Sequence, residues 1–282
     1  MKLSEAIERV PSRRSWLRRG AGAVRALAPS ARLFPEHPFL RISHRGAAAL
    51  EPENSLRGIE VALRYGVEIV EVDGRPCAGG TLVLSHDDNL KRMTGHRGRV
   101  SSSTLAVLKG LDIGKGERIP TLEEALDLMR GRVLVNLDLK RDVDGPQLLR
   151  AVDRSGRREE TMLSGGGRGG FAPYRTLAPS IRSACSMDAT WRDLPGCLLG
   201  RYTTAGARGQ AGWIARGTRA AGATGSTLDW RLAAPAVVDF LHRAGLPVLT
   251  WTVDDLPTLT ALRKAGVDGV TSNRPDLLAQ LA

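Results

Sequence analysis

The feature that most constrains this chain is a regular exchange of buried, strand-like segments with helical ones. Phe39–Ser43 is a short apolar run, Leu56, Ile59 and Leu63 recur at helical spacing, and Val67–Asp73 is a second apolar run. Strand, helix and strand at this spacing predict a parallel pair joined by a right-handed crossover. We therefore expect an α/β protein built on a parallel sheet.

Polar residues mark the carboxyl ends of the predicted strands. In the second strand, Glu71 and Asp73 point to the same side as Val67 and Ile69. The third strand, Val133–Lys140, repeats this arrangement with Asn136, Asp138 and Lys140 on one side. Apolar side chains low on each strand and polar ones at its end are typical of a parallel barrel with its chemistry at the mouth.

Further elements along the chain continue the alternation. Thr121 and Glu124 form a capping box at the start of another predicted helix, and Pro247–Val253 and Val267–Thr271 are strand-like near the C-terminus. We expect a (β/α)8 TIM barrel over residues 38–282. In the glycine-rich run Leu163–Gly170 and the stretch that follows it, the pattern shows little periodicity, so two or three strands are inferred from the architecture alone.

Residues 74–118 interrupt the alternation soon after the second strand. Gly79 and Gly80 separate short strand-like segments, and Thr81–Ser85 leads directly into His86. We expect a small, hairpin-containing insertion that carries His86 back over the barrel mouth.

Three short motifs at these strand ends carry the chemistry. They are His44-Arg45-Gly46, Glu71-Val72-Asp73 and Ser85-His86-Asp87. Two imidazoles can share the acid and base roles of a hydrolysis, and two carboxylates on one side of a strand can bind a hard divalent cation. Arg45 supplies a planar cation that suits phosphate oxygens. The set predicts metal-assisted cleavage of a phosphate ester.

These motifs, with Pro52-Glu53-Asn54-Ser55 between the first two, occur in the order and spacing of a known signature. The chain resembles the glycerophosphodiester phosphodiesterase family, whose motifs run HRG, PEN[TS], E-x-D and HD. The resemblance covers about residues 40–140 well and 245–276 more loosely. It implies a TIM barrel and a phosphoric diester hydrolase acting on a small-molecule glycerophosphodiester.

The resemblance also implies roles for individual residues. His44 and His86 are expected to form the general acid/base pair, and which of them is the acid stays open. Glu71, Asp73 and Asp138 are the expected metal ligands, with Ca²⁺ or Mg²⁺ as the ion. Family members usually have glutamate where this chain has Asp138, so a water molecule could bridge that carboxylate to the ion.

Four further residues are candidates for substrate binding, each with a structural alternative. Arg45 and Lys140 would place positive charge around the phosphate, although Lys140 could also be a solvated strand-end lysine. Asn54 could hydrogen-bond within the site or only cap the first helix, a role that Ser55 can also fill. Trp251 could form an apolar wall against the substrate or belong to the core. Asp87 could orient His86 or only cap a turn.

Three functions remain open from the sequence. The leading one is hydrolysis of glycerophosphodiesters to glycerol 3-phosphate and an alcohol. A lysophospholipase D-type hydrolase acting on membrane lipid would use the same chemistry. A catalytically silent relative that binds a phosphorylated ligand is the third, prompted by the weak middle of the chain and by Asp138.

Residues 1–37 are predicted to form a basic N-terminal extension. Of the formal net charge of +11, nine basic and three acidic residues place +6 within residues 1–41. This segment could be a solvated arm, a surface-binding helix with possible peripheral membrane contact, or a weak twin-arginine-like export signal around Arg13 and Arg14. Because no nucleic-acid-binding motif accompanies the charge, no nucleic-acid partner is expected.

The three cysteines indicate the compartment. Cys77, Cys185 and Cys197 have neither the even count of a disulfide framework nor zinc-ligand spacing. A cytoplasmic protein with reduced cysteines is therefore expected, with export as the alternative.

Overall fold

The computed structural model describes residues 32–140, 143–166, 170–189 and 203–281. The strands in this part of the chain are β1 (Leu40–Ser43), β2 (Ile69–Pro76), β3 (Leu82–Leu84), β4 (Leu134–Leu139), β5 (Thr161–Gly165), β6 (Arg182–Met187), β7 (Gly225–Asp229), β8 (Val248–Trp251) and β9 (Gly269–Ser272). They follow the order β1-β9-β8-β7-β6-β5-β4-β2-β3, and β1 also pairs with β2. Eight parallel strands thus close into a barrel, and β3 is antiparallel to β2.

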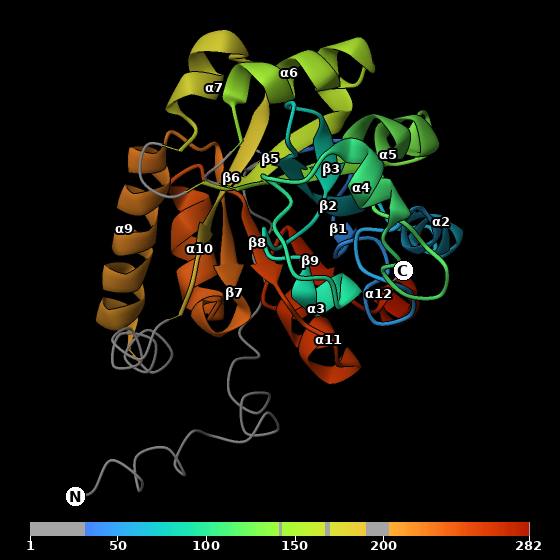
Figure 1. Cartoon of the computed structure of the whole chain (residues 1–282). Coiled ribbons are helices and arrows are strands. Elements are labelled where there is room, and N and C mark those ends of the chain that lie inside the picture. The colour runs from blue at the N-terminus through green and yellow to red at the C-terminus, as the bar shows by residue number, and fades with distance from the viewer. Residues whose placement is uncertain (1–31, 141–142, 167–169, 190–202, 282) are drawn as a thin grey trace, which may run out of the picture.

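Helices surround this barrel (Figure 1). Those described are α2 (Leu56–Arg64), α3 (Lys91–Thr94), α4 (Leu105–Gly110), α5 (Leu122–Met129), α6 (Gly145–Arg154), α7 (Ala172–Leu177), α9 (Thr204–Ala221), α10 (Pro235–Arg243), α11 (Leu256–Lys264) and α12 (Pro275–Leu278). Short 3-10 turns cover Arg158–Glu160, Trp230–Leu232 and Ala279–Leu281. The predicted (β/α)8 TIM barrel is confirmed.

The barrel interior follows the two-residue period of the strands. Its lower layer consists of apolar side chains from five strands, Leu40, Ile42, Ile69, Met162, Ala184 and Leu249. Leu33 and Phe34, which precede the first strand, are buried against this layer. The ordered packing therefore reaches back into the range predicted as the N-terminal extension.

The outward-facing strand residues pack against the helices in a second, larger core. Val70 and Val72 of β2 and Val135 and Leu137 of β4 belong to it. Val67 was expected inside the barrel with Ile69, and this is wrong. Because β2 begins only at Ile69, Val67 lies in the preceding turn and packs in the outer core.

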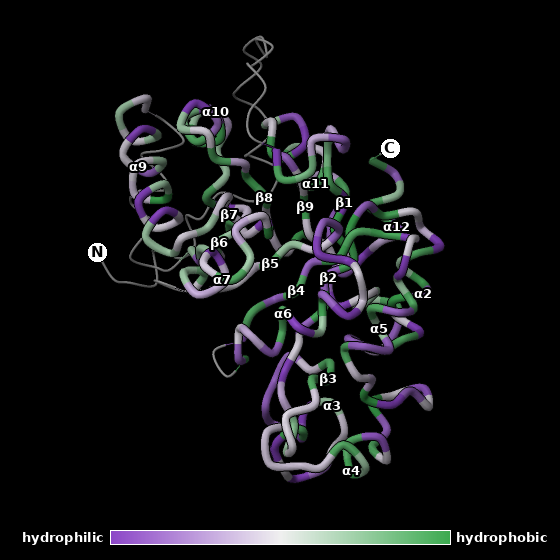
Figure 2. Tube along the Cα trace, turned by 90° about the horizontal axis from the view of Figure 1, so that it is seen from above, coloured by the Kyte–Doolittle hydropathy of each residue, from purple (hydrophilic) through white to green (hydrophobic). Residues whose placement is uncertain are grey.

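The insertion after β2 has the expected hairpin. β2 continues past the mouth to Pro76 and pairs with β3, with Gly74 opposite Leu84. The segment has its own small buried cluster of Cys77, Val83, Leu90, Val100, Leu108, Ile113 and Ile119. Viewed from above, β3, α3 and α4 project from one side of the barrel, away from α9 and α10 (Figure 2).

The middle of the chain supplies the strands that the pattern did not show. β5 includes the start of the glycine-rich run, β6 reads Arg-Ser-Ala-Cys-Ser-Met, and β7 reads Gly-Ser-Thr-Leu-Asp. The small and polar residues of β6 and β7 fit because these strands pack on α9, whose buried side chains are mostly small. Ser226, for example, contacts Thr218 of α9 through a hydroxyl hydrogen bond of 2.7 Å.

The predictions for the N-terminal segment, from surface helix to export signal, fall on residues 1–31 and lie outside the described residues. They stay predictions, as does the boundary at residue 38. No helix in the described ranges has the length and apolar character needed to cross a membrane.

A buried guanidinium joins the helical layer below β4. The side chain of Arg157 is only 2% exposed and donates to the carbonyl oxygens of Leu126, at 3.1 Å, and Val133. Glu160 accepts from its Nε at 2.7 Å. These bonds connect the end of α5 to the start of β4.

We expect Arg157→Leu to lower the free energy of unfolding by about 2–4 kcal/mol, because two carbonyl groups lose their donors. Urea unfolding followed by tryptophan fluorescence measures this. Arg158→Leu is the matched control: Arg158 pairs with Asp153 at the surface, and its loss should cost at most about 1 kcal/mol. Equal losses in the two variants would contradict the structural role of Arg157.

Candidate active site

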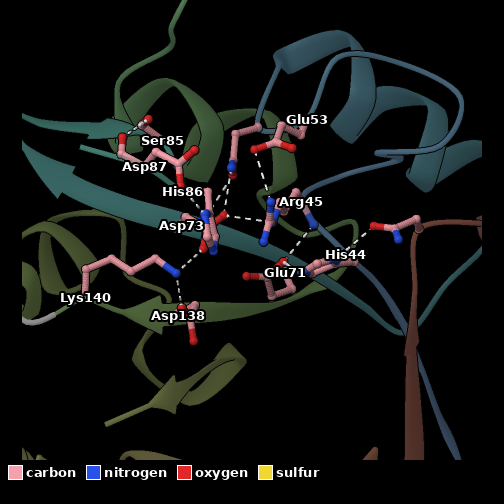
Figure 3. A network of polar contacts seen from close by, with 12 residues as sticks. His44, Arg45, Glu53, Glu71, Asp73, Ser85, His86, Asp87, Asp138 and Lys140 are labelled. Atoms are coloured by element: carbon pink, nitrogen blue, oxygen red, sulfur yellow. Dashed lines mark hydrogen bonds and ion pairs between the residues drawn. The ribbon is translucent and has the colours of Figure 1, made fainter. Parts of the chain in front are cut away.

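Three carboxylates from two neighbouring strands gather at the carboxyl end of the barrel (Figure 3). Parallel pairing places Asp73 of β2 opposite Asp138 of β4, and Glu71 lies one layer lower on the same side. Glu71 and Asp73 are buried, and Asp138 is partly buried. The expected grouping of these three residues is therefore present.

Two cations stabilise this cluster. The Lys140 ammonium lies 2.7 Å from Asp73 Oδ1 and also donates to Asp138 Oδ2. Arg45 Nε lies 3.3 Å from Asp73 Oδ2. Burial would raise the pKa of the Asp73 carboxyl, but Lys140 and Arg45 outweigh it and hold the pKa below its usual value. Lys140 is only 14% exposed, so it is not a solvated strand-end lysine.

Glu71 has less compensation. Its Oε2 accepts from the backbone N–H of Arg45 at 2.7 Å and lies 3.9 Å from His44 Nε2. Burial, followed by the nearby charges of Asp73 and Asp138, raises the pKa of this carboxyl well above its usual value. Within the described residues, Lys140 and Arg45 are the two cations in contact with these three carboxylates, which leaves a negative charge uncompensated.

The His44-Arg45-Gly46 loop requires its glycine. Gly46 has φ +79°, and a Cβ there would lie 2.8 Å from the carbonyl carbon of Gly58 in α2. Arg45 itself has φ +50°, a left-handed conformation that costs energy for a residue with a side chain. This sharp turn directs the backbone N–H of Arg45 at Glu71 while its guanidinium reaches Asp73.

The segment after β9 orients His44. Its Nδ1 lies 2.7 Å from Asn273 Oδ1, and an amide oxygen can only accept, so Nδ1 carries the proton. Asp254 fixes Asn273 by accepting from its Nδ2 at 2.7 Å and its backbone N–H at 2.8 Å. Burial, then Arg45, lowers the pKa of His44. The basic Nε2 of the neutral ring therefore points toward Glu71.

His86 arrives on the insertion. The backbone N–H of Ser85 donates to Asp73 O at 2.9 Å, and Arg75 Nε donates to His86 O at 3.0 Å. His86 Nδ1 lies 2.7 Å from Asp87 Oδ1. Asp87 thus contacts the imidazole instead of only capping a turn, and β2 and its hairpin bring the ring over the carboxylate cluster (Figure 3).

The alternatives for Asn54 and Trp251 are also answered by their contacts. Ser55 caps α2 by accepting from Gly58 N at 2.9 Å, whereas Asn54 Nδ2 donates to Asp73 Oδ2 at 2.8 Å. Trp251 is half-buried at the end of β8, and its indole N–H donates to Thr227 O at 3.2 Å. It sits at the mouth and is not enclosed in the core.

The donor set fits a hard divalent cation in its chemistry. Glu71, Asp73 and Asp138 offer only oxygen, and the neighbouring Asn136 Oδ1 is buried without a hydrogen-bond partner. Within the described residues, however, no group of three His, Cys, Asp or Glu side chains is arranged as a metal site. In this structure the positive charge between Asp73 and Asp138 comes from the Lys140 ammonium.

Several residues that hold this site were not predicted from the sequence. Asn273 directly follows β9 and Asp254 lies three residues after β8, where the carboxyl-end rule could have found them. Glu53 lies inside the Pro52–Ser55 motif and accepts from Arg45 NH1 at 3.2 Å. Arg92, which contacts both Glu53 and Asp87, has no sequence signal beyond its place six residues after His86.

Comparison with known proteins gives a consistent result. A model of the glycerophosphoryl diester phosphodiesterase family matches residues 44–277. The chain is 26% identical to a glycerophosphodiester phosphodiesterase of Caldanaerobacter subterraneus subsp. tengcongensis, over 86% of this chain and 97% of the relative. It is 31% identical to "Probable glycerophosphodiester phosphodiesterase 1" of Mycobacterium tuberculosis H37Rv, over 85% of this chain and 90% of the relative.

Solved structures share the fold. A glycerophosphodiester phosphodiesterase from Agrobacterium tumefaciens matches with a TM-score of 0.70 at 24% identity, covering 86% of this chain and 99% of that one. A phosphodiesterase from Oleispira antarctica, solved with the product sn-glycerol-3-phosphate, matches with a TM-score of 0.68 at 24% identity, covering 86% and 97%. The chain belongs to the glycerophosphoryl diester phosphodiesterase family, whose members are phosphoric diester hydrolases.

Proposed function

We propose that the protein hydrolyses glycerophosphodiesters to glycerol 3-phosphate and an alcohol through His44 and His86. The observation that carries this proposal is the placement of two imidazoles, each oriented through Nδ1, around one cluster of buried carboxylates. A phosphodiester needs a proton removed from the attacking water and another delivered to the departing oxygen. The glycerol 3-phosphate bound by the Oleispira antarctica relative supports the product.

The partners of the two rings favour different roles. Asp87 offers His86 a charged carboxylate oxygen, whereas Asn273 offers His44 only a neutral amide oxygen. We therefore propose that His44 Nε2 takes the proton of the attacking water. His86 Nε2 then gives its proton to the alcohol oxygen as the phosphorus–oxygen bond breaks.

A divalent cation, Ca²⁺ or Mg²⁺, is proposed to bind Glu71, Asp73 and Asp138, in keeping with the general metal dependence of the family. When bound, it supplies positive charge that polarises the phosphoryl group. Arg45 and Lys140 add fixed positive charge around the same group. Asn54 holds Asp73 in place, and Trp251 offers an apolar wall for the glycerol end of the substrate.

Substrates with different leaving groups distinguish the proposed acid from the proposed base. We expect His44→Ala and His86→Ala each to lower kcat/KM for glycerophosphocholine at least about hundredfold. With the p-nitrophenyl ester of glycerol 3-phosphate, whose leaving group needs no proton, His86→Ala should recover to within about tenfold of wild type and His44→Ala should not.

The exposed His96 of the insertion provides the control, because His96→Ala should keep wild-type rates on both substrates. Recovery of His44→Ala in place of His86→Ala would reverse the two assignments. Full activity of either variant on glycerophosphocholine would remove that histidine from the mechanism.

Metal removal tests the carboxylate cluster. EDTA is expected to abolish turnover, and Ca²⁺ or Mg²⁺ to restore it. Glu71→Gln should weaken metal binding about tenfold or more, measured by titration calorimetry without substrate. Glu68→Gln is the matched control, since Glu68 lies just before β2 and pairs with Arg41 away from the mouth. Unchanged activity after exhaustive chelation would refute the metal requirement.

A lysophospholipase D-type activity on membrane lipid is the second candidate, favoured by the net charge of +11. Product analysis on glycerophosphocholine and on lysophosphatidylcholine vesicles separates the two. We expect glycerol 3-phosphate and choline from the soluble diester at a kcat/KM at least about tenfold above that on lipid. Turnover of lipid alone would make the first proposal wrong, and turnover of neither would leave the catalytically silent relative.

A further inference from the structure

Arg92 of α3 joins two carboxylates that come from distant parts of the chain. Its Nε donates to Asp87 Oδ2 at 2.5 Å. Its other two nitrogens bind both oxygens of Glu53, NH2 to Oε1 at 2.7 Å and NH1 to Oε2 at 3.0 Å. One guanidinium therefore bridges the insertion to the loop before α2.

Each of the two carboxylates also contacts a residue of the proposed active site. Asp87 uses its second oxygen, Oδ1, for His86 Nδ1 at 2.7 Å. Glu53 Oε1 also accepts from Arg45 NH1 at 3.2 Å. The result is a continuous chain of contacts from His86 through Asp87, Arg92 and Glu53 to Arg45.

These contacts differ from an ordinary surface ion pair. Glu53 is only 14% exposed, and the pair with Arg92 is bidentate, which fixes direction as well as distance. Burial would raise the pKa of the Glu53 carboxyl, but Arg92 and Arg45 reverse this effect and the pKa lies below its usual value. By contrast, Arg99 of the insertion is 73% exposed and makes a single contact of 3.2 Å with Asp88.

We propose that Arg92 is a positioning residue that fixes Asp87, and through it the orientation and tautomer of His86, against the barrel. The geometry supplies the reason. With Oδ2 held by Arg92, the Asp87 carboxylate cannot rotate away from the imidazole without losing the shorter of its two contacts. The tie to Glu53 then sets where this pair stands relative to Arg45. This inference rests on the proposed catalytic role of His86.

A lysine could not replace this arginine. Three donor directions are used at once, toward Asp87 and toward both oxygens of Glu53, and an ammonium is a point charge without this planar fork. Arg92→Lys keeps the charge and loses the geometry, so it separates positioning from general electrostatics.

We expect Arg92→Ala to lower kcat for glycerophosphocholine about 10- to 100-fold while KM changes less than about threefold. Arg92→Lys should recover only a small part of kcat. Asp87→Asn should lose a similar amount, and the double variant Asp87→Asn/Arg92→Ala should be no worse than the poorer single variant. Arg99→Ala, the matched control, should stay within about twofold of wild type.

A second measurement needs no substrate. In ¹⁵N-labelled protein at alkaline pH, where the imidazoles are neutral, NMR of the ring nitrogens should show the remaining proton of His86 on Nδ1 in wild type and a mixture of tautomers in Arg92→Ala, with His86→Gln assigning the signal. Wild-type kcat and an unchanged tautomer in Arg92→Ala, or losses that multiply in the double variant, would overturn the inference. If Arg92→Ala changes the His86 tautomer but the wild-type protein hydrolyses no glycerophosphodiester, the proposed function alone is contradicted.

Discussion

The site depends on one electrostatic constraint, the grouping of two buried carboxylates and a partly buried third at the mouth of a parallel barrel. Glu71, Asp73 and Asp138 face inward because β2 and β4 pair in register and strand residues alternate sides. Like charges at this depth repel strongly unless cations offset them. Arg45 and Lys140 provide that offset, and they are the residues proposed to bind the phosphate. Under that proposal, the cations that stabilise the cluster also bind the anionic substrate.

The two imidazoles beside this cluster are held in the same way, each through a hydrogen bond at Nδ1, but their partners differ chemically. Each ring donates a hydrogen bond from Nδ1 to an oxygen of a neighbouring side chain, and a third residue fixes that side chain. Asp254 fixes Asn273 beside His44, and Arg92 fixes Asp87 beside His86. The partner of His44 is a neutral amide, and the partner of His86 is a charged carboxylate. In the proposed mechanism, this difference in partner separates the base from the acid among residues of one type.

Much of the fold followed from the sequence because its signals are local. Period-two alternation placed Glu71, Asp73 and Asp138 on one side, and the capping box at Thr121 and Glu124 marked the start of α5. β6 and β7 were not visible because their small polar residues pack on the small buried residues of α9, which leaves no apolar period to detect. β5 has only two large apolar residues, Met162 and Leu163, before its glycine.

The sequence analysis did not identify some residues of the site, for a different reason. Asn273, Asp254 and Arg92 act through other side chains, and nothing in their own neighbourhoods indicates which histidine they will meet. Only the closure of β9 onto β1, and the return of the hairpin along β2, bring them to the two rings.

The insertion gives the site a divided architecture. His44 stands at the end of a barrel strand, whereas His86 belongs to a segment with its own small core, held to the barrel through β3 and a few polar contacts such as that of Arg75. A unit with a separate core can open locally at a lower free energy than the whole protein needs to unfold. Such opening would remove one imidazole while the carboxylates and the barrel stay intact. Substitutions that destabilise the core of the insertion should therefore reduce turnover at a degree of destabilisation that leaves the barrel folded.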